Sequence, residues 1–207
     1  YAGFIEYSEG DFSSALIDLK RAEQNEAYSK IVPYLIANVY FRQQNYEELL
    51  SYVEKVNAIE GVNNKEEIAL LAAEAYYKKN DYKKAFDGYK LYLDGREEKA
   101  DKSVLLRAGY TAFTLGEDAS AIKYLKSSFT DSDSVGFYSA YYLGYLYLKQ
   151  NQKPMAQTAF DIARKFKPDQ KLVEESTFQF AKVSYDLGRP DQAITEFEKI
   201  LLTFPKS

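Results

Sequence analysis

The 207-residue chain contains no cysteine, no histidine and no tryptophan. The absence of cysteine and histidine excludes thiol nucleophiles, disulfides, Cys/His zinc sites and the imidazole that most acid–base catalysis uses near neutral pH. We therefore expect no enzyme activity, no catalytic residue, no metal site and no cofactor.

A strong basic charge and long apolar runs are also missing. The 27 basic and 31 acidic side chains give a net charge of −4. This balance offers little attraction to a phosphate backbone, so nucleic acid is not an expected partner. No apolar run approaches the roughly 18–20 residues of a membrane helix, so we expect no direct membrane insertion by this segment. The chain starts at Tyr1 without a methionine, which predicts that its natural N-terminus is missing.

Apolar side chains are plentiful, at 46% of the residues, and they recur in a fixed order. One run consists of Leu143, Gly144, Tyr147, Ala156, Phe160, Ala163 and Pro168. The same frame recurs at intervals of 34, 36, 36, 35 and 37 residues. A small residue of a first helix lies at Gly3, Ala37, Ala73, Gly109, Gly144 and Ala181. A second helix then holds Ala15, Leu49, Ala85, Ala121, Ala156 and Ala193, and four residues later Leu19, Val53, Tyr89, Leu125, Phe160 and Phe197.

This pattern resembles the tetratricopeptide repeat (TPR) family over the whole chain. Two antiparallel helices cross closely where one presents glycine or alanine and a large side chain of the other fills the space beside it. One hairpin cannot bury its apolar side alone, so hairpins stack. The resemblance implies an all-α fold, a right-handed superhelical solenoid of about six helix-turn-helix repeats. The chain departs from the family in lacking its tryptophan, in Leu49 replacing an alanine, and in keeping the proline only in the last two repeats.

We expect one solenoid over residues 1–207, with twelve helices and no strand. The repeats span about residues 1–29, 30–65, 66–101, 102–136, 137–173 and 174–207, and their helical hairpins about 1–25, 30–58, 66–96, 102–130, 137–167 and 174–204. The loop from Asn57 to Lys65 is expected to widen the array without dividing it. Tyr1 falls inside a helix and no polar helix closes the other end, which predicts a fragment of a longer array.

Turn and cap residues lie where the frame requires them. Residues that tolerate a left-handed backbone fall between paired helices at Gly10, Asn45, Asn80, Gly116, Asn151 and Gly188. Pro154 and Pro190 are expected in the first turn of a helix, and Pro168 and Pro205 beyond helix ends. The polar segment Asp131 to Ser134 is expected to cap the fifth first-helix. A calcium ion is not expected there, because the glycine and glutamate of a calcium loop are missing.

In the TPR family the first helices line a concave face that binds extended peptides, and the resemblance implies the same here. Helical spacing from the small residue of each first helix identifies the side chains on that face. The predicted peptide-binding residues are Tyr7, Tyr34, Asn38, Phe41, Tyr77, Tyr110, Phe113, Tyr138, Tyr141, Tyr145, Phe178 and Tyr185. Equivalent positions hold Phe4, Leu70, Glu74, Leu106, Leu148 and Lys182. Tyrosine suits recognition because it offers a large contact area with few rotors. Packing of these rings against one another is the alternative reading.

Other candidates are expected to be structural. Packing or turn positions hold Tyr40, Tyr46, Tyr76, Tyr82, Tyr89, Tyr92 and Tyr147. Adjacent carboxylates occur at Glu47-Glu48, Glu66-Glu67, Glu97-Glu98 and Glu174-Glu175. Neighbours in sequence splay about 100° apart on a helix, so these carboxylates are expected to be solvated. TPR proteins that bind chaperone tails use a lysine and an asparagine on the first helix. Tyr34 replaces that lysine beside Asn38, which argues against such a partner.

The function predicted from the sequence is a non-catalytic scaffold that binds a partner peptide or helix in an aromatic concave groove. Glycan binding by tyrosine platforms and a self-assembling structural array remain alternatives, and self-association stays open. The C-terminal residues 204–207 resemble the aromatic-Pro-x-Ser closure of bacterial envelope TPR proteins. The tyrosine-rich, tryptophan-free composition is similar to TPR proteins of the Bacteroidetes. These resemblances favour a bacterial envelope or periplasmic setting over the cytoplasm.

Overall fold

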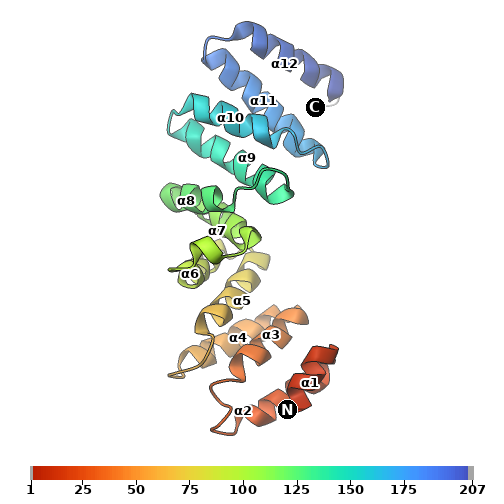
Figure 1. Cartoon of the computed structure of the whole chain (residues 1–207), viewed down its shortest axis with the longest axis vertical. Helices are drawn as coiled ribbons and strands as arrows, with labels where there is room; N and C mark the ends of the chain where they lie inside the picture. The colour runs from red at the N-terminus through yellow and green to blue at the C-terminus, as the bar shows by residue number, and fades with distance from the viewer. Residues whose placement is uncertain (1, 205–207) are drawn as a thin grey trace. The chain divides into compact units, whose positions relative to one another are not determined.

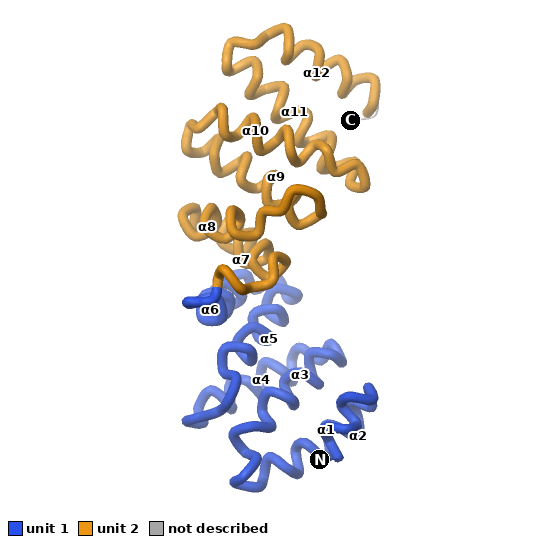
Figure 2. The backbone as a smooth tube through the Cα atoms, in the orientation of Figure 1, with its two compact units in different colours: residues 1–96 blue, residues 97–207 orange. Residues whose placement is uncertain are grey.

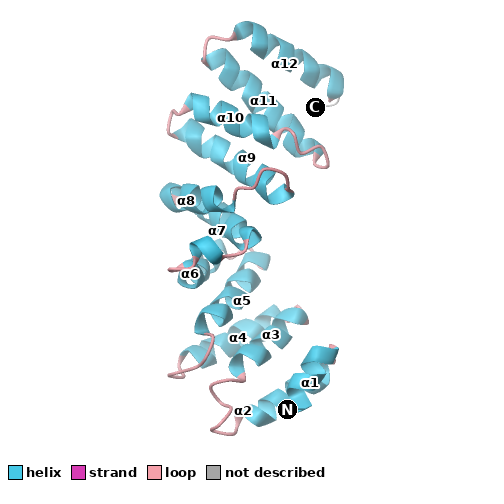
Figure 3. Ribbon diagram, in the orientation of Figure 1, coloured by secondary structure: helices cyan, strands magenta, loops and turns pink. Residues whose placement is uncertain are grey.

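The computed structural model of the chain describes residues 2–204. Within this range helices are joined by loops, without a strand (Figure 3). The α-helices are α1 (Ala2–Glu9), α2 (Phe12–Glu23), α3 (Pro33–Arg42), α4 (Tyr46–Asn57), α5 (Lys65–Lys78), α6 (Tyr82–Leu93), α7 (Lys102–Leu115), α8 (Asp118–Ser128), α9 (Ser134–Lys149), α10 (Lys153–Ala163), α11 (Gln170–Asp186) and α12 (Pro190–Thr203). A short 3₁₀ turn, η1 (Glu97–Lys99), precedes α7. The predictions of twelve helices and no strand are confirmed for these residues (Figure 1).

The helices pair into hairpins inside two compact units, residues 1–96 and residues 97–207 (Figure 2). Unit 1 holds the hairpins α1/α2, α3/α4 and α5/α6, and unit 2 holds α7/α8, α9/α10 and α11/α12. Within each unit the second helix of one hairpin packs against the first helix of the next. First helices also contact each other directly, as α3 contacts α5 and α7 contacts α9. Stacking of hairpins is therefore the packing rule in both units, whereas a single solenoid over residues 1–207 stays a prediction.

The close crossings inside the hairpins are where the frame predicts them. A Cβ atom added to Gly109 would lie 2.7 Å from Leu125, and one added to Gly144 would lie 2.7 Å from the Phe160 ring. Both distances are shorter than any ordinary carbon–carbon contact, so only glycine allows these helices to approach so closely. The hairpin α5/α6 differs, because Gly88 of α6 lies against Ala73 of α5. At this crossing each helix presents a small residue, Ala73 from α5 and Gly88 from α6.

The left-handed turn residues follow the same frame with one correction. Positive φ angles occur at Gly10, Gln44, Asn80, Gly116, Asn151 and Gly188. The prediction for Asn45 is wrong, because Asn45 has a φ of −85° and is the N-cap residue of α4. Its neighbour Gln44 takes the left-handed backbone at 56°. The position in the repeat, one residue before the N-cap, decides the conformation even where the residue is not an asparagine or glycine.

Helix starts depend on capping side chains. Asp133 caps α9 by accepting the backbone N–H of Gly136 at 3.0 Å, which confirms the predicted cap. Asp169 caps α11 in the same way, through the N–H of Leu172 at 3.0 Å. These caps start the two helices three and four residues before the predicted limits of 137 and 174. An aspartate three residues before a helical N–H is a start signal that the repeat spacing does not contain.

The prolines and the wide loop agree with their predicted places. Pro154 and Pro190 lie in the first turns of α10 and α12, and Pro168 lies between α10 and α11. The loop between α4 and α5 lies between Asn57, the last residue of α4, and Lys65, the first residue of α5, as expected. The predictions for Tyr1 and Pro205 lie outside the described residues. Across residues 2–204, none of the helices combines the length and apolarity that a membrane crossing demands.

Candidate functional site

All twelve predicted binding residues lie on first helices, α1, α3, α5, α7, α9 and α11. Ten of them are half-buried, whereas Phe178 and Tyr185 are exposed. Among the additional positions, Glu74 is only 8% exposed, so its prediction as an open groove residue is wrong. A helical count identifies a direction from the helix axis, but it does not reveal which neighbouring helix covers that direction.

In unit 1 the predicted residues are held by packing inside the hairpins. The rings of Tyr7, Phe41 and Tyr77 each lie 5.9 Å from a ring at the start of the second helix. Those partner rings are Phe12, Tyr46 and Tyr82. The Tyr7 hydroxyl also donates to Asn38 Oδ1 at 2.9 Å, and Tyr34 packs against the buried core of the unit. The aromatic pair at each turn gives these side chains a structural role.

Unit 2 brings predicted residues from two repeats into one set of touching rings, the aromatic cluster. Its members are Tyr110 and Phe113 of α7 and Tyr141, Tyr142 and Tyr145 of α9. The Tyr142 ring lies 5.1 Å from Tyr110, 5.2 Å from Phe113 and 5.3 Å from Tyr141. Tyr141 in turn lies 5.2 Å from Tyr145. All five side chains are partly exposed, so the cluster combines a fixed arrangement with accessible ring surface.

The buried ring of Phe160 packs against the aromatic cluster. This residue of α10 is fully buried, and its ring lies 5.3 Å from Tyr145 and 6.5 Å from Tyr141. Both tyrosine rings meet it nearly edge-on, with interplanar angles of 86° and 76°. Edge-to-face contacts of this kind are a favoured geometry for aromatic rings. The close crossing at Gly144 brings the Phe160 ring against α9, and Phe160 in turn contacts both Tyr141 and Tyr145.

A small pocket of about 200 Å³ adjoins the cluster between α9 and α11. The lining residues are Tyr138, Tyr141, Asp169, Lys171, Leu172 and Glu175. Tyr138 and Tyr141 come from the predicted set, whereas the four residues of the α11 side do not. The pocket is thus walled by rings on one side and by two carboxylates on the other.

Tyrosine hydroxyls donate to both carboxylates across the repeat boundary. Tyr138 donates to Asp169 Oδ2, and Tyr145 donates to Glu175 Oε1 at 2.5 Å. The bond from Tyr138 and the N–H of Leu172 lower the pKa of Asp169. The same bond raises the pKa of Tyr138 to about 12. Burial, together with the bond to Glu175, raises the pKa of Tyr145. At neutral pH this leaves Asp169 ionised and both tyrosines neutral.

Comparisons with known proteins agree with this architecture. Residues 175–207 match the family model described as tetratricopeptide repeat. Structures of YrrB and of the MamA protein superpose with TM-scores of 0.71 and 0.66. The chain has the tetratricopeptide repeat fold. Identity to YrrB is 15%, over 91% of this chain and 93% of YrrB. Identity to MamA is 17%, over 87% of this chain and 94% of MamA.

A TPR protein from Parabacteroides merdae ATCC 43184 is also similar, with a TM-score of 0.59. Its identity is 16%, over 97% of this chain and 77% of that protein. YrrB is described as a TPR protein with an unusual peptide-binding site. No curated protein matches the sequence. At these identities the solved structures establish the TPR fold, and the predicted envelope setting stays a prediction.

Three residues of the candidate site were not predicted as binding residues. Tyr142 lies three positions before Tyr145 and is its neighbour on the helix surface, but it faces the preceding repeat. Asp169 precedes the predicted start of its helix. Glu175 was assigned to a solvated pair, which is wrong, because its carboxylate lines the pocket and accepts from Tyr145 and Gln179. An acid that follows an aromatic repeat position by about thirty residues, as Glu175 follows Tyr145, is the signal that could have found two of them.

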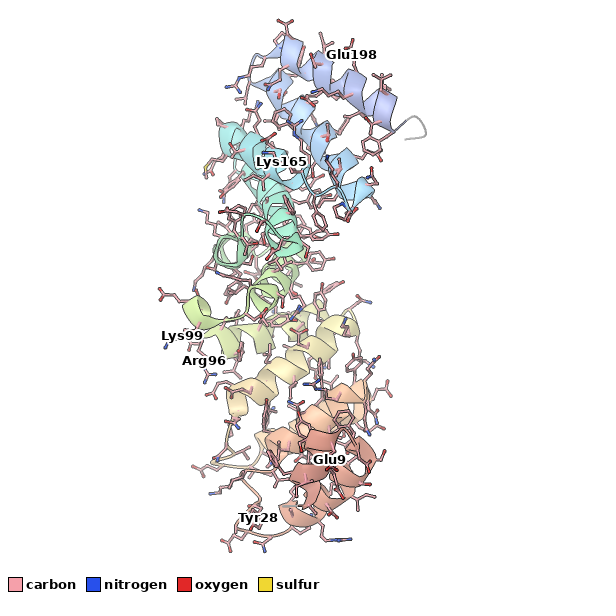
Figure 4. The ribbon with its side chains drawn as sticks, turned by 45° about the vertical axis from the view of Figure 1, so that its right-hand side comes forward. Glu9, Tyr28, Arg96, Lys99, Lys165 and Glu198 are labelled. Atoms are coloured by element: carbon pink, nitrogen blue, oxygen red, sulfur yellow. The ribbon has the colours of Figure 1, made fainter. Side chains whose placement is uncertain are left out.

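The other three acidic pairs each place at least one carboxylate against a cation, and both carboxylates of Glu66-Glu67 contact Arg96. Glu47 binds Lys79 at 2.9 Å, Glu67 binds Arg96 at 2.8 Å (Arg96 is labelled in Figure 4), and Glu97 binds Lys123. Glu175 differs from them in having neutral partners. Asp169 likewise has no ion pair within 4.0 Å among the described residues, although Lys171 lies near enough to favour its charged form. Nowhere between residues 2 and 204 do three or more acidic side chains form a group that could hold a metal ion.

The hydroxyl bonds predict a loss of stability at alkaline pH. The pKa of Tyr138 is raised to about 12 from 10.0, so the folded protein keeps a proton that the unfolded chain releases. The stabilisation is therefore complete below about pH 10 and is lost as the pH rises towards 12. We expect Tyr138→Phe to lower the urea midpoint at about pH 8, with a difference from wild type that shrinks towards pH 12. The exposed Tyr185 provides the control Tyr185→Phe, which should follow wild type throughout; a difference for Tyr138→Phe that is independent of pH would contradict the assignment.

Proposed function

We propose that this chain is a non-catalytic interaction scaffold, and that the aromatic cluster of unit 2 binds a peptide segment or a helix of a partner protein. The observation that carries the proposal is the set of five touching, partly exposed rings contributed by two successive repeats. Tyrosine and phenylalanine supply large contact area at low cost in side-chain entropy, and clustered aromatics dominate the energy of many interfaces. The description of YrrB as a peptide-binding TPR protein supports this use of the fold.

The rigidity of the cluster favours binding over chemistry. Each ring contacts at least one other ring, and Tyr141 and Tyr145 also rest on the buried Phe160. A preformed surface loses little entropy when a ligand docks. A tyrosine hydroxyl both donates and accepts, so the Tyr145 hydroxyl can accept a hydrogen bond from a bound backbone while it donates to Glu175.

Selection from a library of random peptides displayed on phage tests the proposal. The wild-type chain is the bait, and each enriched peptide is then measured against Tyr110→Ala/Tyr142→Ala and against Tyr28→Ala. Tyr28 is an exposed loop residue of unit 1 and serves as the matched control. We expect the double variant to bind at least about tenfold more weakly, because truncating a central aromatic of an interface costs roughly 1–2 kcal/mol or more.

Circular dichroism must show equal helix content for the three proteins. Peptides that bind the double variant as tightly as wild type would contradict the proposal, as would a selection that enriches no peptide. Either result would favour the two alternatives, glycan binding and self-assembly of the array. Oligosaccharide titration followed by tyrosine fluorescence and light scattering at several protein concentrations test them in turn.

A further inference from the structure

The pocket beside the aromatic cluster has a chemical character of its own. Two carboxylates, Asp169 and Glu175, face two tyrosine rings, Tyr138 and Tyr141, across about 200 Å³. Typical small-molecule sites occupy about 300–1,000 Å³, so a pocket of this size suits a single side chain better than a whole ligand. The walls determine which kind of side chain it can take.

The two carboxylates keep acceptor capacity for a cation. Glu175 accepts both of its hydrogen bonds, from Tyr145 and Gln179, at Oε1. Asp169 accepts one bond at each oxygen, from the N–H of Leu172 and the hydroxyl of Tyr138. Each ionised carboxylate oxygen can accept about two hydrogen bonds. All these donors are neutral, so neither negative charge is balanced by a direct ion pair in the described part of the chain.

Lys171 also lines the pocket and must be counted. Its side chain is exposed, and the pKa of Asp169 is lowered first by the bond from Tyr138 and only last by the Lys171 charge. A flexible ammonium on an exposed stem can turn into solvent when another cation arrives. With Lys171 included, the lining still carries one net negative charge.

We propose that this pocket binds a single cationic side chain, such as an arginine, from the segment that docks on the aromatic cluster. A guanidinium can donate to both carboxylates through separate N–H groups while its flat face lies against a tyrosine ring. The negative charge of this pocket is opposite in sign to that of a site that binds the carboxylate of a peptide C-terminus. The inference rests on the proposed function, because it identifies the chemistry of the same ligand.

The first test uses a probe that needs no known partner. N-acetyl-arginine amide is titrated into ¹⁵N-labelled protein, and N-acetyl-citrulline amide, which has the same shape without the charge, is titrated in parallel. We expect saturable amide shifts around Asp169 and Glu175 with arginine only. Glu175→Gln should weaken this binding about tenfold, since it removes a charge-assisted hydrogen bond of roughly 1.4 kcal/mol.

Two further variants separate charge from structure. Asp169→Asn keeps an N-cap side chain for α11, so its effect reports the lost charge. Glu174→Gln makes the same change one residue away from Glu175, outside the pocket lining, and should bind as wild type does. Equal binding of the arginine and citrulline amides, no saturable shift with arginine, or equal effects of Glu174→Gln and Glu175→Gln would each overturn the proposal.

The peptides selected on the aromatic cluster separate this inference from the proposed function. If the inference holds, they carry an arginine or lysine whose replacement by citrulline or norleucine weakens binding to wild type more than binding to Glu175→Gln, which keeps Asp169. Selected peptides that need the cluster but no cation would refute the cationic pocket and leave the scaffold standing. Arginine-amide binding without any selected peptide would refute the scaffold instead.

Discussion

Replacing Phe160 with alanine is expected to destabilise unit 2 by about 3–5 kcal/mol, as for other large aromatic side chains removed from a closed core. Phe160 is fully buried, and its ring fills the space beside Gly144 where α9 and α10 cross. Glycine has no side chain that could move into the resulting cavity. Urea unfolding followed by circular dichroism measures the loss, and Met155→Ala on the same helix is the control. Met155 is 45% exposed, so its truncation should change stability by no more than about 0.5 kcal/mol.

The Phe160 substitution should also weaken peptide binding under conditions where the protein remains folded. Tyr141 and Tyr145 both lose the ring on which they rest. The ring contacts that remain are between Tyr141 and Tyr145 and between Tyr141 and Tyr142, together with the hydrogen bond from Tyr145 to Glu175. A loss of stability below about 1 kcal/mol would show that the hairpin collapses around the missing ring, and that the Gly144 crossing does not depend on it.

The hairpins could be predicted because their determinants are local and repeated. Gly144 and Phe160 lie sixteen residues apart, and the same pairing recurs as Gly3 with Leu19 and Gly109 with Leu125. A periodic frame averages over six examples, so a deviation such as Leu49 does not disturb it. Where residue type was preferred to the frame, as with Asn45 in place of Gln44, the prediction failed.

The polar half of the candidate site could not be predicted in the same way. Glu175 joins the pocket because Tyr145, thirty residues earlier, reaches across from the preceding repeat. That contact depends on the register between α9 and α11, which hairpin periodicity does not fix. Adjacent glutamates looked equivalent along one helix, although of the two only Glu175 lines the pocket. Contacts between repeats, more than those within them, decide the chemistry of the site.

The same consideration explains why equivalent positions differ between the units. Four residues beyond the small residue, Tyr7, Phe41 and Tyr77 each find an aromatic ring at the start of the next helix. At the corresponding places in unit 2, Phe113 is followed by Asp118 and Leu148 by Lys153. Without a ring at the turn, Phe113 packs on Tyr142 of the next repeat. A change at the turn thus converts an intra-hairpin contact into an inter-repeat one, and it builds the aromatic cluster.

Arg164 performs a comparable joining role between the last two repeats through charge. Its guanidinium contacts Asp161 of α10 at 2.6 Å and Glu196 of α12 at 2.8 Å, and it lies 3.9 Å from the centre of the Phe180 ring of α11. The Glu196 side chain is only 10% exposed. A carboxylate so deeply placed depends on its partners, since an uncompensated buried charge is costly.

Arg164→Ala is therefore expected to destabilise unit 2 by about 2–3 kcal/mol. This is less than the roughly 3–5 kcal/mol for a fully buried broken pair, because Lys199 still contacts Glu196 at 2.9 Å and Lys165 still contacts Asp161 at 2.9 Å. Lys165→Ala, just beyond the end of α10 (Figure 4), is the matched control. Its ammonium binds the same Asp161 but is 61% exposed, so the expected loss is below about 0.5 kcal/mol. Urea midpoints at low and high salt measure both, and the Arg164 effect should persist at high salt because the pair is shielded from solvent. Equal losses of stability for the two variants would mean that Arg164 stabilises the protein through its ion pair with Asp161 and not through its contacts with Glu196 and Phe180.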